Sequence, residues 1–289
     1  MPGPAPAPDP AAVLAALGLP APAAAQPAVG GFDALVWRVE FDGRPYALRV
    51  LGPGSEGRCA REVAALAAAG AAGAPVPTVR VQGQWEGRPA LLVDWCPGQS
   101  LVDAIRARPP EARRLGRLFG SAQAALHALA APPALNADWL GAGGPEAAAV
   151  EARLRALPAR TDVLAHFDYH PYNVLTDGTR ITGVIDWDHA GAADPRADLA
   201  RTLSILRLEA RRPGLFSPLI VAAILRFDLG WREGYAAACG VTVGAEHALF
   251  YAWAGFAMAR DLAGKRSPEF LRGVRRWAAR WAARAGCRV

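Results

Sequence analysis

Lysine is almost absent from this sequence of 289 residues. Lys265 is the only one, although lysine and arginine together number 32. The net charge of +6 and the pI of about 9.6 therefore come from arginine. A basic protein suggests a nucleic-acid partner, but these arginines are scattered and form no stripe interleaved with aromatic residues. The sequence therefore favours a compositional bias over a nucleic-acid interface, and we expect no nucleic-acid partner.

Cysteine is also scarce, with four residues: Cys59, Cys96, Cys239 and Cys287. None are spaced as a CxxC pair, which argues against both a disulfide framework and a zinc knuckle. We expect free thiols in a reducing compartment, and hence a cytoplasmic location.

Long apolar runs are missing too. The longest candidate, 215–225, is too short to span a bilayer. The first ten residues lack a basic region and are broken by prolines, which is unlike a signal peptide and typical of a flexible tail. We expect no membrane partner, and the sequence gives no indication of oligomeric state.

What is present in the first third is a strand pattern rich in aromatic and branched residues. Asp42-Gly43 between two such runs is a strong hairpin signal. The predicted elements are strands over 29–41, 44–51, 78–85 and 89–95 and a helix over 59–70. Pro97 and Gly98 then interrupt the pattern.

Beyond residue 97 the chain becomes helical. Apolar residues recur at helical spacing over 111–130, a looser helix lies near 145–157, and about four helices follow residue 196. Breaks at 211–214, 239–244 and 264–268 separate these last helices. The pattern predicts an α+β protein in three parts: a flexible Pro/Ala-rich tail with a short helix (1–26), a small β-rich lobe with one helix (27–97), and a larger helical lobe (98–289).

The chemistry is concentrated in residues 166–188, "HFDYHPYNVLTDGTRITGVIDWD". A strand over 163–168 leads to Asp168, and a hairpin pairs 173–176 with 180–187. Because strand ends are rigid, Asp168, Asn173 and Asp186 are expected close together. Phosphoryl transfer needs such a set: hard oxygen ligands for Mg²⁺ and a carboxylate beside the attacking hydroxyl.

This stretch resembles the catalytic loop of kinase-fold enzymes. His166 is followed by Asp168 two residues on and Asn173 five beyond that, and Asp186 follows after thirteen residues. "HPYNVL" and "IDWDHAGAADPRADLA" (185–200) are most similar to the aminoglycoside phosphotransferase and choline kinase branch. The resemblance implies a bilobal protein-kinase-like fold. It also implies an ATP-dependent O-phosphotransferase that uses ATP and Mg²⁺ to phosphorylate a hydroxyl of a small molecule, such as an aminoglycoside, amino alcohol or sugar.

The same resemblance assigns roles in the large lobe. Asp168 would be the catalytic base, and Asn173 and Asp186 would hold Mg²⁺. His166 and Asp198 would support the catalytic loop. Asp188 is a weaker candidate for the metal or for its surroundings.

In the small lobe, the family places a lysine on the third strand, paired with a glutamate on the helix. Here Arg49 stands at that position and Glu62 is the expected partner. A guanidinium grips phosphate oxygens bidentately and stays charged, although it is bulkier than an ammonium group.

Two further small-lobe features are implied. Gly30-Gly31 would let the backbone approach the nucleotide phosphates, although the full G-x-G-x-x-G pattern is missing. The connection between the lobes would bind adenine through the backbone of Asp94, Trp95 and Cys96.

Two other interpretations remain open at this point. The Arg49 replacement and the incomplete glycine loop are compatible with a kinase-shaped protein that binds nucleotide without turnover. His166 and His170 with the aspartates suggest a metal hydrolase, but no His-Glu-x-x-His or comparable ligand set accompanies them.

The acceptor is the least determined part. Residues 200–289 are basic overall, which disfavours a polycationic aminoglycoside. Aromatic residues at 231, 235, 251, 253, 277 and 281 either line an acceptor site or, as is more usual at helical spacing, belong to the core.

Overall fold

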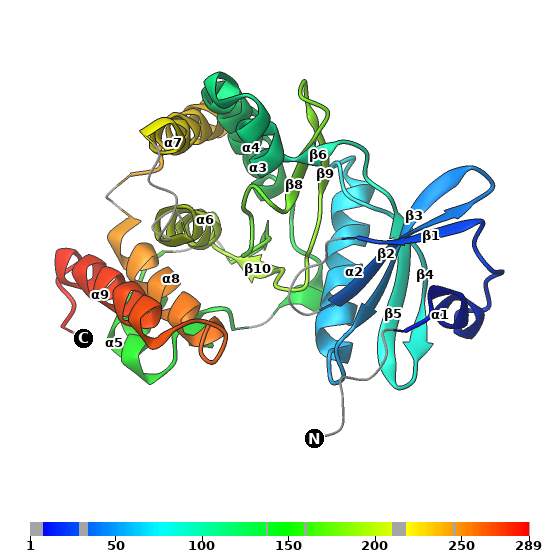
Figure 1. The fold of residues 1–289 in the computed structure, drawn as a ribbon. Coiled ribbons are helices and arrows are strands. Elements are labelled where there is room, and N and C mark those ends of the chain that lie inside the picture. The colour runs from blue at the N-terminus through cyan, green and yellow to red at the C-terminus, as the bar shows by residue number, and fades with distance from the viewer. Residues whose placement is uncertain are drawn as a thin grey trace.

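The computed structural model describes residues 8–28, 34–136, 138–158, 161–209, 218–244 and 247–288. These residues form a small lobe built on a sheet and a larger lobe built mainly of helices (Figure 1). Helix α2 (Glu56–Ala71) lies between the sheet and the large lobe. The nucleotide site predicted from the sequence falls on this junction.

The small-lobe sheet is antiparallel, with the strand order β1-β2-β3-β5-β4. Its strands are β1 (Ala24–Pro27), β2 (Ala34–Phe41), β3 (Arg44–Leu51), β4 (Val79–Trp85) and β5 (Arg88–Asp94). Asp42 and Gly43 join β2 to β3 with φ angles of 49° and 70°, as an Asp-Gly hairpin requires. The sheet begins at Ala24 with β1, which pairs with β2 along its whole length, whereas the first strand predicted from the sequence begins at residue 29.

The predicted tail contains a packed helix, α1 (Pro10–Ala16). The Asp9 side chain caps it by accepting a hydrogen bond from the Ala11 amide. Val13 and Leu14 are fully buried against one face of the sheet. This burial holds α1 on the sheet, so the described part of the tail belongs to the small lobe.

Strand alternation decides where Arg49 points. In β3, Leu48 and Val50 belong to the apolar cluster under α1, whereas Leu51 packs against Cys59 of α2 on the other face. Since alternate residues of a strand face opposite sides of a sheet, Arg49 faces α2 and the large lobe.

The large lobe is organised around helices that bury a single continuous core. Its helices are α3 (Leu101–Ala107), α4 (Ala112–His127), α5 (Ala148–Arg155), α6 (Pro195–Glu209), α7 (Pro218–Cys239), α8 (Ala248–Asp261) and α9 (Pro268–Arg284). Short ribbons complete it: β6 (Gln99–Ser100) with β8 (Val174–Thr176) and β9 (Ile181–Val184), and β7 (Val163–Ala165) with β10 (Gly191–Ala193). The four helices predicted after residue 196 are present as α6 to α9.

Helix α3 was missed by the sequence prediction. Ser100 caps it, since its hydroxyl accepts a hydrogen bond from the Asp103 amide at 3.1 Å. The Ser-x-x-Asp spacing is a capping signal that the nearby Pro97 and Gly98 obscure. In the part of the chain that the structure describes, no helix is both long and apolar enough to cross a membrane.

Helices α4 and α7 lie side by side (Figure 1) and approach each other through glycines. A Cβ atom on Gly120 of α4 would lie 2.1 Å from the Trp231 carbonyl oxygen, and one on Gly234 of α7 would lie 2.2 Å from the Arg117 carbonyl oxygen. Backbone therefore packs directly on backbone at this crossing. The contact fixes α4, which carries residues that support the catalytic loop.

We expect Gly120→Ala to lower the free energy of unfolding by about 1–3 kcal/mol, because the added methyl group would overlap the α7 backbone. The matched control is Gly273→Ala in α9, where an added Cβ meets no atom within 4 Å. This control is expected to be neutral or stabilising by up to about 1 kcal/mol, since alanine favours a helix over glycine. Urea unfolding of both variants measures the difference, and equal effects would contradict the close crossing.

Candidate active site

The loop that carries Asp168 begins one residue after β7 ends at Ala165. The predicted strand over 163–168 is therefore three residues too long. The physical reason is Phe167, which adopts a left-handed conformation with φ of 61° and cannot continue a strand. Such a conformation persists only where neighbours hold it, and here the Phe167 amide donates a hydrogen bond to the buried Asp198 carboxylate.

Asp168 is held by two side chains of its own loop. Asn173 Nδ2 donates to Asp168 Oδ2 at 2.9 Å and to the Asp168 carbonyl oxygen at 3.1 Å. His170 Nε2 lies 3.3 Å from the same carboxylate. Burial by itself raises the pKa of Asp168, but His170, His189 and His166 outweigh it and hold that pKa below its usual range. Asp168 is therefore ionised at neutral pH.

Asp186 lies beside Asn173. Strand β9 ends at Val184, earlier than the predicted 187, because Asp186 is left-handed with φ of 66°. The Ile185 amide donates to the Asn173 carbonyl oxygen at 2.9 Å, and His166 Nε2 lies 3.0 Å from the Ile185 carbonyl oxygen. These bonds bring the loop of Asp168 and Asn173 against the segment that carries Asp186, which is the arrangement predicted from the sequence.

A buried polar network supports the loop from below. Asp198 Oδ2 is 2.9 Å from His127 Nε2 and accepts a bond from Gln123 Nε2 at 3.0 Å. Burial raises the pKa of Asp198, but these two partners together with His166 bring it below its ordinary value. Burial also lowers the pKa of His166, which keeps that ring neutral. Sequence reasoning missed Gln123 and His127, although two polar residues four positions apart on the apolar face of the 111–130 helix were a usable signal.

Arg49 joins the two lobes. Its guanidinium forms an ion pair with Glu62, and Nη2 lies 3.3 Å from Asp186 Oδ1. Burial alone would lower the pKa of Arg49, but Glu62 and Asp186 more than compensate, so the pKa is raised and the charge is kept. Burial raises the pKa of Glu62 while Arg49 opposes that shift. The contact between Arg49 and Glu62 expected from the sequence is thus present, and Arg49 also reaches the aspartate proposed to hold metal.

Two other arginines of α2 reach the same segment, and the sequence analysis did not identify them. Arg58 Nη1 lies 3.3 Å from Asp188 Oδ2, and Arg61 Nη1 donates to the Asp188 carbonyl oxygen at 2.9 Å. Burial raises the pKa of Asp188, and the charge of His189 opposes that shift. Asp188 is therefore engaged with the small lobe through both its carboxylate and its carbonyl oxygen.

In the connection between the lobes, some polar groups already have hydrogen-bond partners within the small lobe. The Asp94 amide donates to the Thr78 carbonyl oxygen at 2.9 Å, so this amide is already engaged within the small lobe. Its carboxylate is held by Arg80 at 2.7 and 2.8 Å. Burial raises the pKa of the Cys96 thiol to about 11, which keeps it protonated. Trp95 and Cys96 follow β5 in this connection, whereas Gly30 and Gly31 lie outside the described residues.

The donor set fits a magnesium ion. The Asn173 amide nitrogen donates a hydrogen bond to Asp168. The Asn173 amide oxygen and the Asp186 carboxylate could therefore both serve as hard oxygen ligands for the ion. Among the described residues, no group of three or more His, Cys, Asp and Glu side chains is arranged to hold a metal. A site with few protein ligands suits Mg²⁺, which shares its remaining positions with phosphates and water. It does not suit the metal hydrolase interpretation, which needs a complete protein ligand set.

Most of the aromatic residues considered for the acceptor belong to the core. Trp231, Trp253 and Tyr251 are at most 2% exposed. Trp277 and Trp281 do line a cavity of about 320 Å³, which they share with these residues of α6, α7, the loop after α7 and α8: Leu203, Arg207, Arg232, Gly244 and Tyr251. All four cysteines are free, as expected.

Comparison with known proteins places the chain in a family. Residues 24–241 match the model of the phosphotransferase enzyme family. The viomycin phosphotransferase of Streptomyces vinaceus is 32% identical, in a match that covers 39% of this chain and 48% of that protein. The chain thus matches only about half the length of this curated relative.

Solved structures agree on the fold. An aminoglycoside phosphotransferase APH(4)-Ia, crystallised as a variant with AMP-PNP and hygromycin B, has a TM-score of 0.65 at 16% identity over 94% of this chain and 96% of that one. An aminoglycoside-3'-phosphotransferase of type VIII has a TM-score of 0.57 at 25% identity over 81% and 93%.

A protein-kinase-like, two-lobed architecture with a phosphotransferase-type catalytic loop is therefore the class that fold and site define. The chain belongs to the phosphotransferase enzyme family. Both the resemblance drawn from residues 166–200 and the fold class predicted from the sequence are confirmed.

Proposed function

We propose that this protein is an ATP-dependent O-phosphotransferase that moves the γ-phosphate of ATP to a hydroxyl of a small molecule. The observation that carries the proposal is the contact of Arg49 with Asp186 at 3.3 Å across the lobe junction. It sets a phosphate-binding cation opposite a carboxylate suited to magnesium, next to the loop of Asp168. Phosphoryl transfer depends on positioning and charge stabilisation of this kind more than on covalent chemistry.

In this proposal each group has a distinct task. Asp168 accepts the hydrogen bond of the acceptor hydroxyl and takes its proton as the new P–O bond forms and ADP leaves. Because its pKa is low, Asp168 orients the hydroxyl more than it attracts the proton early. Asn173 and His170 fix the orientation of its carboxylate.

Arg49 binds phosphate oxygens of the nucleotide. When it does so, these oxygens replace its contact with Asp186, while the ion pair with Glu62 keeps the guanidinium in place. Magnesium, when held by Asn173 and Asp186, would neutralise charge on the phosphates. Trp95 and Cys96 offer backbone groups to the adenine.

Two of the three similar proteins named above indicate where to search for the acceptor. One is called a viomycin phosphotransferase and the other was crystallised with hygromycin B. The basic arginines of the large lobe still disfavour a strongly polycationic acceptor, so amino alcohols, sugars, amino acids and macrolides belong in the same screen.

The test is a coupled ADP-release assay with Mg-ATP and each of these acceptors, combined with melting curves. We expect Mg-ATP to raise Tm, since a ligand that binds only the folded state stabilises it. We further expect at least one acceptor to accelerate ADP release and to gain a phosphate by mass spectrometry. Failure of Mg-ATP to shift Tm at any concentration would contradict the proposal.

The second candidate is a nucleotide-binding protein without turnover. The direct contact of Arg49 with Asp186 favours it, because this ion pair competes with a metal ion for the carboxylate. A Tm shift with Mg-ATP but no acceptor-dependent ADP release across the screen would support this candidate instead.

A further inference from the structure

Helix α2 carries the residue that positions Arg49, yet it belongs to both lobes. On one side Cys59 packs against the sheet residues Leu51, Leu91 and Val93. On the other side Ala65, Leu66 and Ala69 join the core of the large lobe. Helix α2 is therefore packed between the two lobes, with an apolar contact to each.

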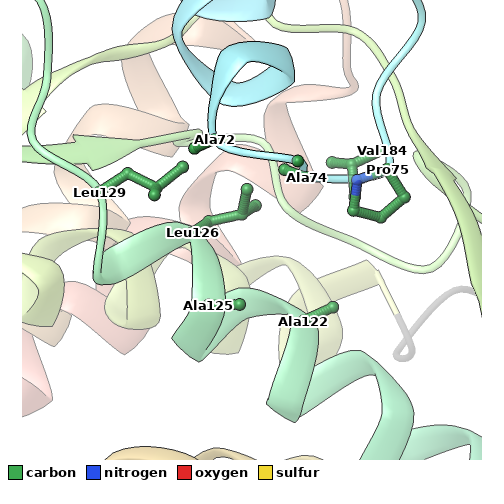
Figure 2. Close-up of a pocket in the computed structure, with 9 residues that line it drawn as sticks. Ala72, Ala74, Pro75, Ala122, Ala125, Leu126, Leu129 and Val184 are labelled. Atoms are coloured by element: carbon green, nitrogen blue, oxygen red, sulfur yellow. The ribbon is translucent and has the colours of Figure 1, made fainter.

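The segment that follows the helix contacts the large lobe, since the Val184 amide donates to the Pro75 carbonyl oxygen at 2.7 Å. A crevice of about 160 Å³ separates the residues that follow α2, including Ala72, Ala74 and Pro75, from Leu126 and other apolar residues of α4 (Figure 2). Its labelled side chains are alanine, proline, valine and leucine. No polar side chain of this set ties the end of α2 to the large lobe.

The near end is tied by the two arginines. Arg58 is held on both sides, since Nη2 donates to Ser55 Oγ at 2.8 Å while Nη1 pairs with the Asp188 carboxylate at 3.3 Å. Arg61 Nη1 donates a hydrogen bond to the Asp188 carbonyl oxygen at 2.9 Å. The Asp188 side chain is 13% exposed and that of Arg58 is 34% exposed, so these bonds are partly buried.

The geometry points to a positioning role. Arg58 and Arg61 both precede Glu62 within about one turn of the same helix, and Asp188 is two residues beyond Asp186, whose backbone is left-handed. The helix and the loop are therefore joined at two sites: through Glu62, Arg49 and Asp186, and through the α2 arginines and Asp188.

We propose that Arg58 and Arg61 are positioning residues that lock α2 to the Asp186 loop through Asp188, and so keep Arg49 aligned with the nucleotide phosphates before ATP binds. This inference rests on the proposed function for its kinetic consequence, but the lock itself is a property of the unliganded protein. In this role Asp188 is an anchor for α2 and not a magnesium ligand.

Kinetics test the consequence. R58A, R61A and D188A are each expected to raise the KM for Mg-ATP by about 3- to 30-fold, the range seen when residues outside a site change its coupling, with a smaller change in kcat. R58A and D188A remove the same contact, so the double variant is expected to be no worse than the more affected single variant. R58K keeps a cation near Asp188 and is expected to recover part of the loss. The matched control R117A removes an arginine contact to Glu233 on the α4–α7 face and is expected to match the wild type.

Hydrogen exchange of the unliganded protein tests the lock without any assumption about activity. R58A, R61A and D188A are expected to speed amide exchange across α2, and R117A is not. Wild-type exchange in all three variants would overturn the proposal. So would a D188A variant that loses turnover and needs far more magnesium while R58A keeps wild-type kinetics, because Asp188 would then be a metal ligand. Absence of ADP release in the wild type would count against the proposed function alone, since the exchange result still decides the lock.

Discussion

Asp168→Asn is expected to lower kcat by roughly 10²- to 10⁴-fold, the contribution typical of a positioned base, and to leave the affinity for Mg-ATP nearly unchanged. The substitution keeps the shape of the side chain, so it can still meet Asn173 and His170. It removes the negative charge that accepts the proton of the hydroxyl. The loss therefore belongs to the chemical step and not to nucleotide binding.

Single-turnover kinetics with the best acceptor, together with a nucleotide titration, separate these two effects. The matched control is Asp177→Asn, a solvent-facing aspartate of the hairpin turn whose carboxylate bonds to Thr179 and Arg180. This control is expected to retain wild-type kcat. Undiminished turnover by Asp168→Asn would remove Asp168 from the mechanism. A large rise in the KM for Mg-ATP would instead indicate that Asp168 contributes mainly to nucleotide or metal binding.

The sequence was sufficient for the parts of this site that lie close together along the chain. Asp168, Asn173 and Asp186 share one short stretch whose strand ends bring them together, and β3 alternation directs Arg49 to α2. Local strand and helix patterns also located most elements of both lobes. Local patterns predict well the type of secondary structure, through its periodicity, and the proximity of residues within about twenty positions of one another.

Contacts between distant segments were beyond such patterns. Gln123 and His127 meet Asp198 more than seventy positions later, and Arg58 meets Asp188 after 130 positions. Each pairing depends on how α2, α4 and α6 pack, which no periodicity determines. The predicted strands that lead to Asp168 and Asp186 are longer than the observed ones for a related reason. The backbone is left-handed at Phe167 and Asp186, and at Phe167 the amide bond to Asp198, a tertiary contact, accompanies it.

The second large effect concerns the buried support of the loop. Asp198→Ala is expected to lower the free energy of unfolding by about 3–5 kcal/mol at pH 7, the usual cost of removing one partner from a buried charged network. Asp198 is 1% exposed, and its loss leaves His127 Nε2 and the Phe167 amide without their acceptor and Gln123 Nε2 with Thr202 alone. Phe167 also loses the bond that keeps it left-handed, so kcat is expected to fall as well.

The effect of Asp198→Ala is also expected to depend on pH in a defined direction. Since the pKa of Asp198 is lower in the folded protein than its ordinary value, its contribution is fully present above an unfolded pKa of about 4 and is lost as pH falls through the folded pKa. The difference in unfolding free energy between wild type and variant is therefore expected to be constant from pH 7 to 5 and to shrink toward pH 3.

Urea unfolding of wild type and Asp198→Ala between pH 7 and pH 3 measures this difference in unfolding free energy. The titration of the other carboxylates affects both proteins equally and so cancels from the difference. Asp198→Asn serves where the alanine variant fails to fold, because the amide keeps the size of the side chain but supplies only one oxygen to three donors. Asp138→Ala removes an exposed aspartate paired with Arg155 and is expected to leave the pH 7 stability nearly unchanged. A difference that stays constant down to pH 3 would mean that Asp198 supports the loop through shape alone and not through its charge.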